Sequence, residues 1–419
     1  MTGPARVVVV GAGLAGLRVV EELRAGGYAG AVTLVGAEQR PPYDRPPLSK
    51  KVMLGELDDT SLRADMASLE TDVRLGEAAV ELGDGVLRTD AGEYSFDALV
   101  LATGASPVRL PGGGEQRVLR TADDALALRD LLRPGTRLAI IGAGWIGAEL
   151  ATAAVRRGCT VTVLEAAATP LMAAVGPEIG GVTAAWYAEA GVDLRLGQSV
   201  ASIEPGGIAL SASGLGGGAL GDGALGDGVI GDGVIGDGGW LPADVIVTAI
   251  GVRPAVDWLA GSPVRIENGV AVDSQLRTSV PGVFAAGDCA SFWSRRYQQR
   301  LRVEHWDVAL HGPEVVAANV LGGSAEYDPV PYFWSEQFGR MVQYVGWHGG
   351  AERLLWRGDP AEAKWAACWL AGNRLVATLT VGLPRDLLQS RRVIEAGGLV
   401  DPAKLADPAI PVRDTVIAT

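Results

Sequence analysis

The chain has 419 residues, of which 48% are hydrophobic and 20% charged, and its formal net charge is −13. This length allows two or three domains with separate cores, and the acidic balance argues against nucleic acid, since a phosphate backbone attracts Lys and Arg. The three cysteines form no C-x-x-C pair, no secretory signal precedes the first predicted strand, and no apolar run approaches the ~18 residues of a membrane span. We therefore expect a soluble, multidomain protein of the cytoplasm, and we predict no metal site.

The first predicted element is a buried strand, Val7–Val10, that runs into a glycine motif at 11–16. The first glycine permits a tight turn, the second leaves room for a pyrophosphate, and the third lets the following helix pack closely on the strand. N–H groups at the start of that helix, predicted over 17–24, face the phosphates. We interpret the motif as a dinucleotide site rather than a structural turn, with Gly11, Gly13, Leu14, Ala15 and Gly16 as cofactor-binding residues.

The second strand of this unit is predicted at Ala31–Val35. An acid that accepts ribose hydroxyls is expected about 20 residues beyond the glycines; Glu38 is the candidate, with a surface glutamate as the alternative. The four prolines of the following run, Arg40–Lys50, exclude regular helix and predict a stiff, extended loop. Arg45 and Lys50 would place cations against an anionic cofactor, although the residues alone are equally consistent with solvated charges.

The chain then repeats this device. A strand at Asp97–Leu101 leads into a glycine turn, after which a strand at Arg137–Ile141 runs into a second glycine motif at 142–147. Glu165 ends the next strand and no Arg or Lys follows at 166–169, so its carboxylate would bond a free 2′-hydroxyl and repel a 2′-phosphate. We therefore expect this site to prefer NADH over NADPH. Two nucleotide motifs imply two dinucleotides, or one that stays bound and one that exchanges. A hydride shuttle needs both a resident and a diffusible carrier.

The region 215–239 is low in complexity, with four copies of a pentapeptide pattern that begins at Ala219. A five-residue period suits neither helix nor strand, so we predict an expanded loop at the tip of a hairpin, and its aspartates match no calcium-binding spacing. Later strands are predicted at 243–250 and Val283–Ala285. Asp288, just beyond, would accept hydrogen bonds from a ligand hydroxyl, cap the next helix, or both. The tryptophan-rich C-terminal part is expected to form a separate α+β domain.

These residues resemble the FAD-dependent NAD(P)H:ferredoxin reductases that serve bacterial oxygenases, over nearly the whole chain. The resemblance implies an α/β, glutathione-reductase-like fold with two Rossmann-type dinucleotide-binding domains and a C-terminal α+β domain. It implies an FAD-binding domain at 1–113 and 246–323, an NADH-binding domain at 114–245 with the repeat insertion at 215–239, and a C-terminal domain at 324–419. It is carried by both glycine motifs and by Arg45-Pro46-Pro47-Leu48-Ser49-Lys50, Ala102-Thr103-Gly104, Ala286-Gly287-Asp288, Glu304-His305-Trp306 and Trp334-Ser335-Glu336-Gln337.

The resemblance also implies roles for particular residues. Lys50 would lie near the reactive end of the flavin and pair with Glu149, and these two are the catalytic candidates. The family usually has an acid at the position of Ala37, so Glu38 must substitute for it, and His311 stands where glutamine is common. The other implied FAD contacts are Glu38, Arg45, Val80, Ala102, Thr103, Gly104, Arg120, Gly287, Asp288, Glu304, His305, Trp306 and Trp334. The implied NADH contacts are Gly142, Gly144, Trp145, Ile146, Gly147, Glu165 and Gly251.

The implied activity is electron transfer from NADH through FAD to a two-iron ferredoxin that feeds an oxygenase. Lys50 would stabilise negative charge on the reduced ring, with Glu149 orienting the lysine. The stretch 294–302 holds four arginines and no acid, and would steer an acidic ferredoxin unless it is only a solvated basic loop; these are Arg295, Arg296, Arg300 and Arg302. The alternative functions are an NADH oxidase or an apoptosis-inducing-factor-like redox sensor. A disulfide-reducing flavoenzyme is disfavoured, because no cysteine precedes residue 158.

Overall fold

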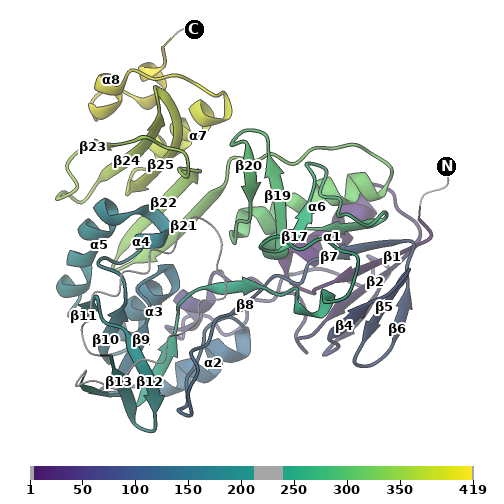
Figure 1. Ribbon diagram of the computed structural model, residues 1–419, viewed down its shortest axis with the longest axis horizontal. Helices are drawn as coiled ribbons and strands as arrows, with labels where there is room; N and C mark the ends of the chain where they lie inside the picture. The colour runs from purple at the N-terminus through teal and green to yellow at the C-terminus, as the bar shows by residue number, and fades with distance from the viewer. Residues whose placement is uncertain (1–3, 212–238, 418–419) are drawn as a thin grey trace.

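The computed structural model describes residues 4–211 and 239–417. Two units built on parallel sheets lie on opposite sides of the molecule, and a C-terminal unit built on an antiparallel sheet sits above the second of them (Figure 1). The predicted repeat loop at 215–239 lies outside the described residues except for Gly239, so it stays a prediction. No helix in the described parts of the chain is long and apolar enough to cross a membrane.

Four consecutive valines, Val7–Val10, form the central strand of the first sheet, because β-branched side chains pack well in a parallel sheet buried on both faces. The strand order is β18-β7-β1-β2-β3 and every pair is parallel. Helices α1 and α6 pack together and share one core with these strands. The bounds are β1 (Arg6–Val10), α1 (Leu14–Ala25), β2 (Ala31–Gly36), β3 (Thr71–Leu75), β7 (Ala98–Leu101), β18 (Val283–Ala285) and α6 (Trp306–Val320), with smaller sheets of β4 (Ala79–Leu82), β5 (Val86–Thr89) and β6 (Glu93–Ser95), and of β17 (Val270–Val272), β19 (Ala290–Ser294) and β20 (Gln299–Leu301).

The second sheet repeats this construction in the order β11-β10-β9-β15, again with parallel pairs. In both units an aspartate accepts the backbone N–H of the first residue of the central strand. Asp97 accepts the Arg6 N–H at 2.8 Å, and Asp244 accepts the Arg137 N–H at 2.9 Å. The bounds are α2 (Ala122–Leu131), β9 (Arg137–Ile141), α3 (Trp145–Arg156), β10 (Thr160–Glu165), α4 (Met172–Val175), α5 (Pro177–Glu189), β11 (Asp193–Leu196) and β15 (Val245–Thr248), with a three-stranded sheet of β12 (Val200–Glu204), β13 (Gly207–Leu210) and β14 (Trp240–Pro242).

The chain crosses between the two units at β8 (Ala105–Pro107) and β16 (Val252–Pro254), which pair antiparallel. The proline-rich run also bridges the units, because Leu48 and Val52 are buried in the core of the second unit. The expected extended loop is wrong for its last residues, since Leu48–Val52 form a short π-helix, η1. Proline is tolerated at a helix start, so Pro47 precedes the helix without breaking it.

The C-terminal part forms the expected α+β unit, an antiparallel sheet in the order β21-β22-β25-β24-β23 with helices α7 and α8. It packs on the second unit, where Trp186 of α5 shares a core with Trp365 of β24. The exact domain boundaries stay a prediction. The bounds are β21 (Tyr332–Gln337), β22 (Arg340–Gly346), β23 (Arg353–Arg357), β24 (Trp365–Ala371), β25 (Arg374–Val381), α7 (Pro384–Glu395) and α8 (Pro402–Ala406), and the 3-10 turns are η2 (Asp257–Leu259), η3 (Gly287–Cys289) and η4 (Val412–Thr415).

Candidate functional site

A cavity of about 780 Å³ lies where the two parallel-sheet units and the C-terminal unit meet. It extends from the carboxyl ends of β1 and β2 to the start of α3, the position at which open α/β sheets bind ligands. Most of the predicted residues line it. They are Gly11, Gly13, Leu14, Ala15, Glu38, Arg45, Lys50, Ala102, Thr103, Gly104, Arg120, Trp145, Ile146, Glu149, Gly287, Asp288, Glu304, His305, Trp306 and Trp334.

The glycines of the first turn fall into two kinds. At Gly11 and Gly16 a side chain would clash with the protein backbone, whereas Gly13 faces open space. Gly11 has φ +113°, and a Cβ there would overlap the carbonyl oxygen of Ala102. A Cβ on Gly16 would overlap the Gly11 carbonyl oxygen. A Cβ on Gly13 would meet no atom of the described residues within 4 Å, although Gly13 lines the cavity. The open space beside Gly13 is where the motif predicts a pyrophosphate.

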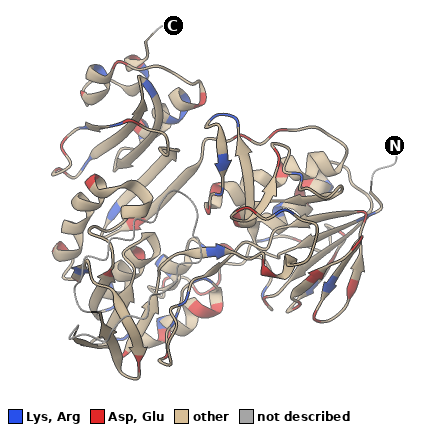
Figure 2. Cartoon of the chain, viewed as in Figure 1, with Lys and Arg blue, Asp and Glu red and all other residues tan. Residues whose placement is uncertain are grey.

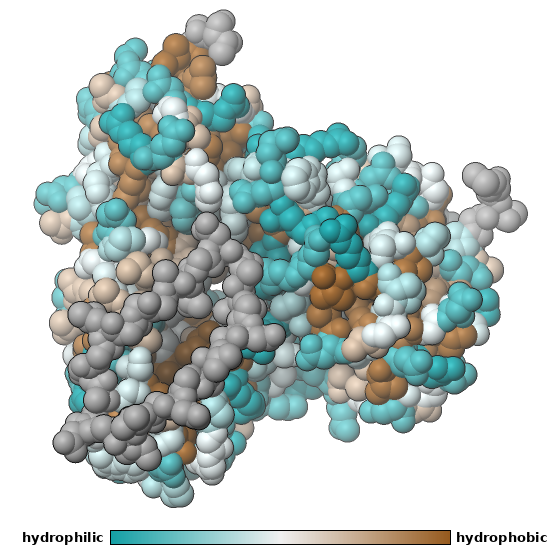
Figure 3. All heavy atoms as spheres, viewed as in Figure 1, coloured by the Kyte–Doolittle hydropathy of each residue, from teal (hydrophilic) through white to brown (hydrophobic). Residues whose placement is uncertain are grey.

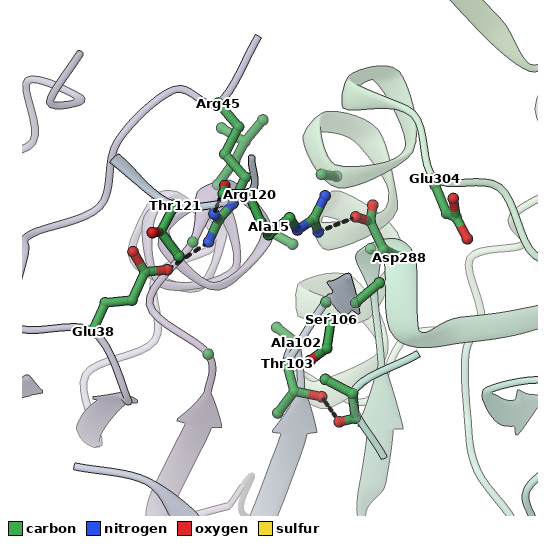
Figure 4. Close-up of a pocket in the computed structure, with 18 of the residues that line it drawn as sticks. Ala15, Glu38, Arg45, Ala102, Thr103, Ser106, Arg120, Thr121, Asp288 and Glu304 are labelled. Carbon is green, nitrogen blue, oxygen red and sulfur yellow. Dashed lines mark hydrogen bonds and ion pairs between the residues drawn. The ribbon is translucent and has the colours of Figure 1, made fainter. Parts of the chain in front are cut away.

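The charges at one end of the cavity are paired with each other (Figure 4). Arg45 donates to the Glu38 carboxylate at 2.7 Å and to the carbonyl oxygen of Arg120 at 2.6 Å. The Tyr43 hydroxyl donates to the other Glu38 oxygen at 2.6 Å, and burial, reinforced by Glu38, raises the pKa of Tyr43 to about 12. Arg45 is therefore not a free cation. Its hydrogen bonds fix Glu38 and connect the proline-rich run to the backbone of Arg120.

A second ion pair at the cavity wall joins Arg120, in the loop that precedes α2, to Asp288 in η3. Arg120 donates to Asp288 at 2.7 Å (Figure 4). The alternative that Asp288 caps a helix is wrong, because η3 begins at Gly287 and its cap position, Ala286, makes no side-chain cap. The other Asp288 oxygen has no hydrogen-bond partner among the described residues, so Asp288 can still accept a ligand hydroxyl.

Lys50 and Glu149 form the predicted pair. The Lys50 ammonium lies 2.7 Å from a Glu149 oxygen, with side chains 14% and 4% exposed respectively. The Ser49 hydroxyl donates to the same oxygen at 2.5 Å. The pair joins η1 of the first unit to α3 of the second, and a charged pair this enclosed is screened much less than one in water.

Aromatic side chains of α3, α6 and β21 complete the wall. Trp306 and Trp334 meet edge to face with ring centroids 5.9 Å apart, and Trp145 lies 4.6 Å from Phe333. His305 lies beside Phe333, with ring centroids 5.0 Å apart. Burial lowers the pKa of His305 to about 4, so its imidazole is neutral at pH 7.

The second glycine motif adjoins the cavity through its helix. Trp145 and Ile146, at the start of α3, line the cavity, whereas Gly142, Gly144, Gly147, Glu165 and Gly251 do not. Its glycines repeat the pattern of the first motif, because a Cβ on Gly144 would meet no protein atom within 4 Å. Glu165 accepts the N–H groups of Ala143 and Ala167, both at 2.8 Å, which holds its carboxylate at the turn.

Two predicted FAD contacts lie beside the cavity rather than in its lining. Val80 is exposed, while Ala79 next to it lines the cavity. Gly16 packs against the backbone of Gly11 instead of facing the cavity. Several lining residues have no sequence signal of their own. These are Tyr43, Asp44, Thr121, Trp258 and Phe333; Asp44 accepts the indole N–H of Trp306 at 2.7 Å across 262 residues of sequence.

The cavity fits a bound flavin dinucleotide on two observations. Buried polar atoms of three lining residues have no hydrogen-bond partner among the described residues, namely Arg120 Nε, Trp258 Nε1 and His305 Nδ1. Buried donors and acceptors are nearly always paired in folded proteins, so these atoms mark places for ligand atoms. The open cradle beside Gly13 matches the pyrophosphate of such a ligand.

Comparison with known proteins places the chain in a family. Residues 5–312 match the family described as pyridine nucleotide-disulphide oxidoreductase, and residues 332–416 match one described as reductase C-terminal. A relative in Burkholderia cepacia, the ferredoxin–NAD(+) reductase component of an anthranilate 1,2-dioxygenase system, is 37% identical, and the alignment covers 97% of this chain and 98% of the relative.

Two solved structures are similar over nearly the full length. The crystal structure of Fdr9 is 45% identical with a TM-score of 0.88, covering 97% of this chain and 99% of that one. The putidaredoxin reductase in its covalent complex with putidaredoxin is 30% identical with a TM-score of 0.89, covering 98% of each chain. The chain therefore belongs to the pyridine nucleotide-disulphide oxidoreductase family, among its ferredoxin–NAD reductases.

Proposed function

We propose that the protein is an FAD-dependent NADH:ferredoxin reductase that supplies electrons to an oxygenase through a two-iron ferredoxin. One observation carries this proposal: a single cavity joins the first glycine turn, the Lys50–Glu149 pair and the start of the helix that follows the second glycine motif. When bound, FAD supplies the conversion of a two-electron donor into single-electron steps. The names of the related reductases support the same partner class.

The chain's own residues supply binding, orientation and electrostatics. The turn at Gly13 and the N-terminus of α1 would hold the pyrophosphate, and Asp288, fixed by Arg120, would accept a hydroxyl of the cofactor chain. Lys50 holds a positive charge at the cavity wall, where its side chain is 14% exposed and its charge is screened less than in bulk water. The aromatic wall of Trp145, Trp306 and Trp334 encloses the same space.

A disulfide-reducing activity is disfavoured by the cysteines. All three are free and buried, and none lines the cavity. Burial raises the pKa of Cys159, Cys289 and Cys368, the last to about 12, so these thiols are poor nucleophiles at neutral pH. The alternatives are an NADH oxidase or a redox-sensing flavoprotein.

The test compares these functions directly. Anaerobic mixing with NADH should bleach the yellow holoprotein rapidly, and addition of a two-iron ferredoxin should then give ferredoxin-dependent reduction of cytochrome c. Very slow bleaching with a long-lived charge-transfer band would favour the redox sensor. Rapid NADH consumption by oxygen that ferredoxin does not accelerate would favour the oxidase.

Glu165 should set the preference for NADH. In Glu165→Ala the carboxylate that would bond the 2′-hydroxyl and repel a 2′-phosphate is lost. We expect the ratio of kcat/KM for NADH to that for NADPH to fall by about tenfold, measured with a small electron acceptor, on the scale of about one lost charged hydrogen bond. Glu189→Ala, which changes an exposed acid of α5 in the same unit, is the control; an unchanged ratio in Glu165→Ala would refute this role.

Two of the four arginines proposed for ferredoxin docking are engaged within the chain. Arg300 donates to carbonyl oxygens of Val272 and Ser291 and pairs with Glu267, and Arg302, 9% exposed, pairs with Glu304. Arg295 and Arg296 are exposed at the hairpin between β19 and β20. The backbone of this hairpin carries the Lys and Arg colour in Figure 2, and hydrophilic residues predominate around it in Figure 3.

Both exposed arginines also have partners within the chain. Arg295 pairs with Glu326 at 2.6 Å, and Arg296 donates to the carbonyl oxygens of Ile394 and Glu395 at the end of α7. These bonds hold the two cations at the boundary between the first unit and the C-terminal unit. Arg295 and Arg296 nevertheless stay exposed, whereas the side chains of Arg300 and Arg302 are 26% and 9% exposed, so we propose that the docking contribution of this stretch comes from Arg295 and Arg296 alone.

Charge reversal tests this patch. The double variant Arg295→Glu/Arg296→Glu should lower kcat/KM for ferredoxin by about tenfold at low ionic strength, and the difference should shrink with added salt because the attraction is screened. Arg88→Glu is a matched control, since Arg88 on β5 is also exposed and paired with acids, Glu81 and Glu93. A double variant with the rate and salt dependence of the control would exclude docking here.

A further inference from the structure

One face of α3 meets the edge of the C-terminal sheet. Positions 145, 149 and 152 of α3 share a face at helical spacing, and they meet β21 and the residue that follows it. Three contacts make this junction: Trp145 with Phe333, at 4.6 Å between ring centroids; the Ser335 hydroxyl with Glu149, at 2.6 Å; and the Phe338 N–H with the Thr152 hydroxyl, at 2.9 Å. The C-terminal unit thus reaches the helix that carries Glu149.

Each oxygen of the Glu149 carboxylate has its own donors. Oε1 accepts the Ser335 hydroxyl, while Oε2 accepts the Lys50 ammonium at 2.7 Å and the Ser49 hydroxyl at 2.5 Å. A carboxylate that is 4% exposed depends on such donors, because each oxygen left unpaired carries the full cost of desolvation. Ser335 donates to Oε1, so it fixes the rotation of the carboxylate and leaves Oε2 facing Lys50.

Ser335 is itself held in one orientation. It is fully buried on β21, and its oxygen accepts the side-chain amide of Gln337 at 3.1 Å. With that lone pair engaged, the hydroxyl hydrogen points to Glu149. The resulting chain of hydrogen bonds runs from Gln337 through Ser335 and Glu149 to Lys50, which lines the cavity.

We propose that Ser335 is a positioning residue, which fixes the Glu149 carboxylate and through it the Lys50 ammonium, so that the C-terminal unit sets the electrostatics of the flavin cavity. This inference rests on the proposed function, in which Lys50 stabilises charge in that cavity. It assigns to the C-terminal unit a part in the chemistry besides enclosing the cavity.

The test is Ser335→Ala, compared with Ser390→Ala. Ser390 is also fully buried in the C-terminal unit, but its hydroxyl has no partner among the described residues. In Ser335→Ala holoprotein we expect Glu149 to turn away from Lys50 in a crystal structure and the midpoint potential of the flavin to become more negative. Flavin reduction by NADH should slow by about tenfold with the KM for NADH unchanged, the scale of a lost hydrogen bond to a charged group. Ser390→Ala should match the wild type in all three.

A double variant shows whether Ser335 acts through Glu149. In a Glu149→Gln background, Ser335→Ala should slow flavin reduction by less than about twofold, because the carboxylate it positions is already gone. A full tenfold effect there, or a Ser335→Ala protein that matches Ser390→Ala in structure, potential and rate, would overturn the inference. Should Ser335→Ala not fold, Ser335→Cys, whose thiol is a weak donor, takes its place, and Ser335→Thr should restore the wild-type values.

Failure of the proposed function is a different result. Wild-type holoprotein that NADH does not bleach would refute the reductase assignment. The position of Glu149 and the flavin potential in the Ser335 variants would still decide whether Ser335 sets the geometry of the pair.

Discussion

Lys50→Met is expected to slow the reduction of the flavin by NADH by roughly 10²–10³-fold, the effect of removing one oriented donor from a site where negative charge develops. The Lys50 ammonium lies at the cavity wall, with its side chain 14% exposed and paired with a buried carboxylate, so its charge is screened less than an ion in bulk water. Anaerobic stopped-flow measurement of flavin absorbance gives the rate. KM for NADH should change little, because the nucleotide motif at Gly142–Gly147 is intact.

Lys51→Met is the matched control for this prediction. Lys51 follows directly in η1 and is exposed, and it does not line the cavity. Removing Lys50 also leaves Glu149 buried without its cation, which costs stability by about 3–5 kcal/mol. The double variant Lys50→Met/Glu149→Gln should recover much of that stability while remaining slow. Equal flavin reduction in Lys50→Met and Lys51→Met would exclude the role of Lys50.

The second large effect concerns two glycines of the first motif, Gly11 and Gly13, whose replacement by alanine should have different consequences. Gly11→Ala should destabilise the protein by about 3 kcal/mol or more, because φ is +113° and a Cβ would overlap the backbone of Ala102. Gly13→Ala should change the stability of the apoprotein by less than about 1 kcal/mol, since its Cβ meets no protein atom. Its methyl group would instead occupy the pyrophosphate cradle, and the purified protein should lose most of its flavin.

Two measurements distinguish these outcomes: the ratio of flavin to protein absorbance, and thermal unfolding with and without added FAD. Gly144→Ala is the control, because Gly144 has the same open surroundings in the second motif. It should retain the flavin and raise the KM for NADH. A Gly13→Ala protein with full flavin content would show that the pyrophosphate lies elsewhere.

A comparison of the two parallel-sheet units gives a reason why the first has no acid at the position that corresponds to Glu165. Val10 pairs with Val35 and Ile141 pairs with Leu164, so Gly36 is the counterpart of Glu165. A Cβ on Gly36 would lie 2.5 Å from that of Ala12, which leaves no room for a side chain at that position. We propose that the first unit uses Glu38, two residues later, as its ribose acid; Tyr43 and Arg45 hold the Glu38 carboxylate in place.

Local sequence patterns are enough to specify the two nucleotide-binding units. Each is a buried strand, a glycine turn and a helix within twenty adjacent residues, at Arg6–Ala25 and again at Arg137–Arg156. The pairing of Lys50 with Glu149, expected only from the family resemblance, is present in the structure. Local patterns and family motifs thus predict the two nucleotide-binding units and the Lys50–Glu149 pair at the cavity.

Which charged side chains have partners depends on how distant segments pack. Arg300 and Arg302 look like a solvated basic loop in sequence, yet Arg300 bonds Val272 and Glu267, and Arg302 bonds Asn268 and Glu304. Ser335 meets Glu149 across 186 residues of sequence, a contact that no local pattern records. Partners of this kind are set by how whole units pack, because hydrogen bonds between distant segments depend on backbone positions that no short stretch of sequence specifies.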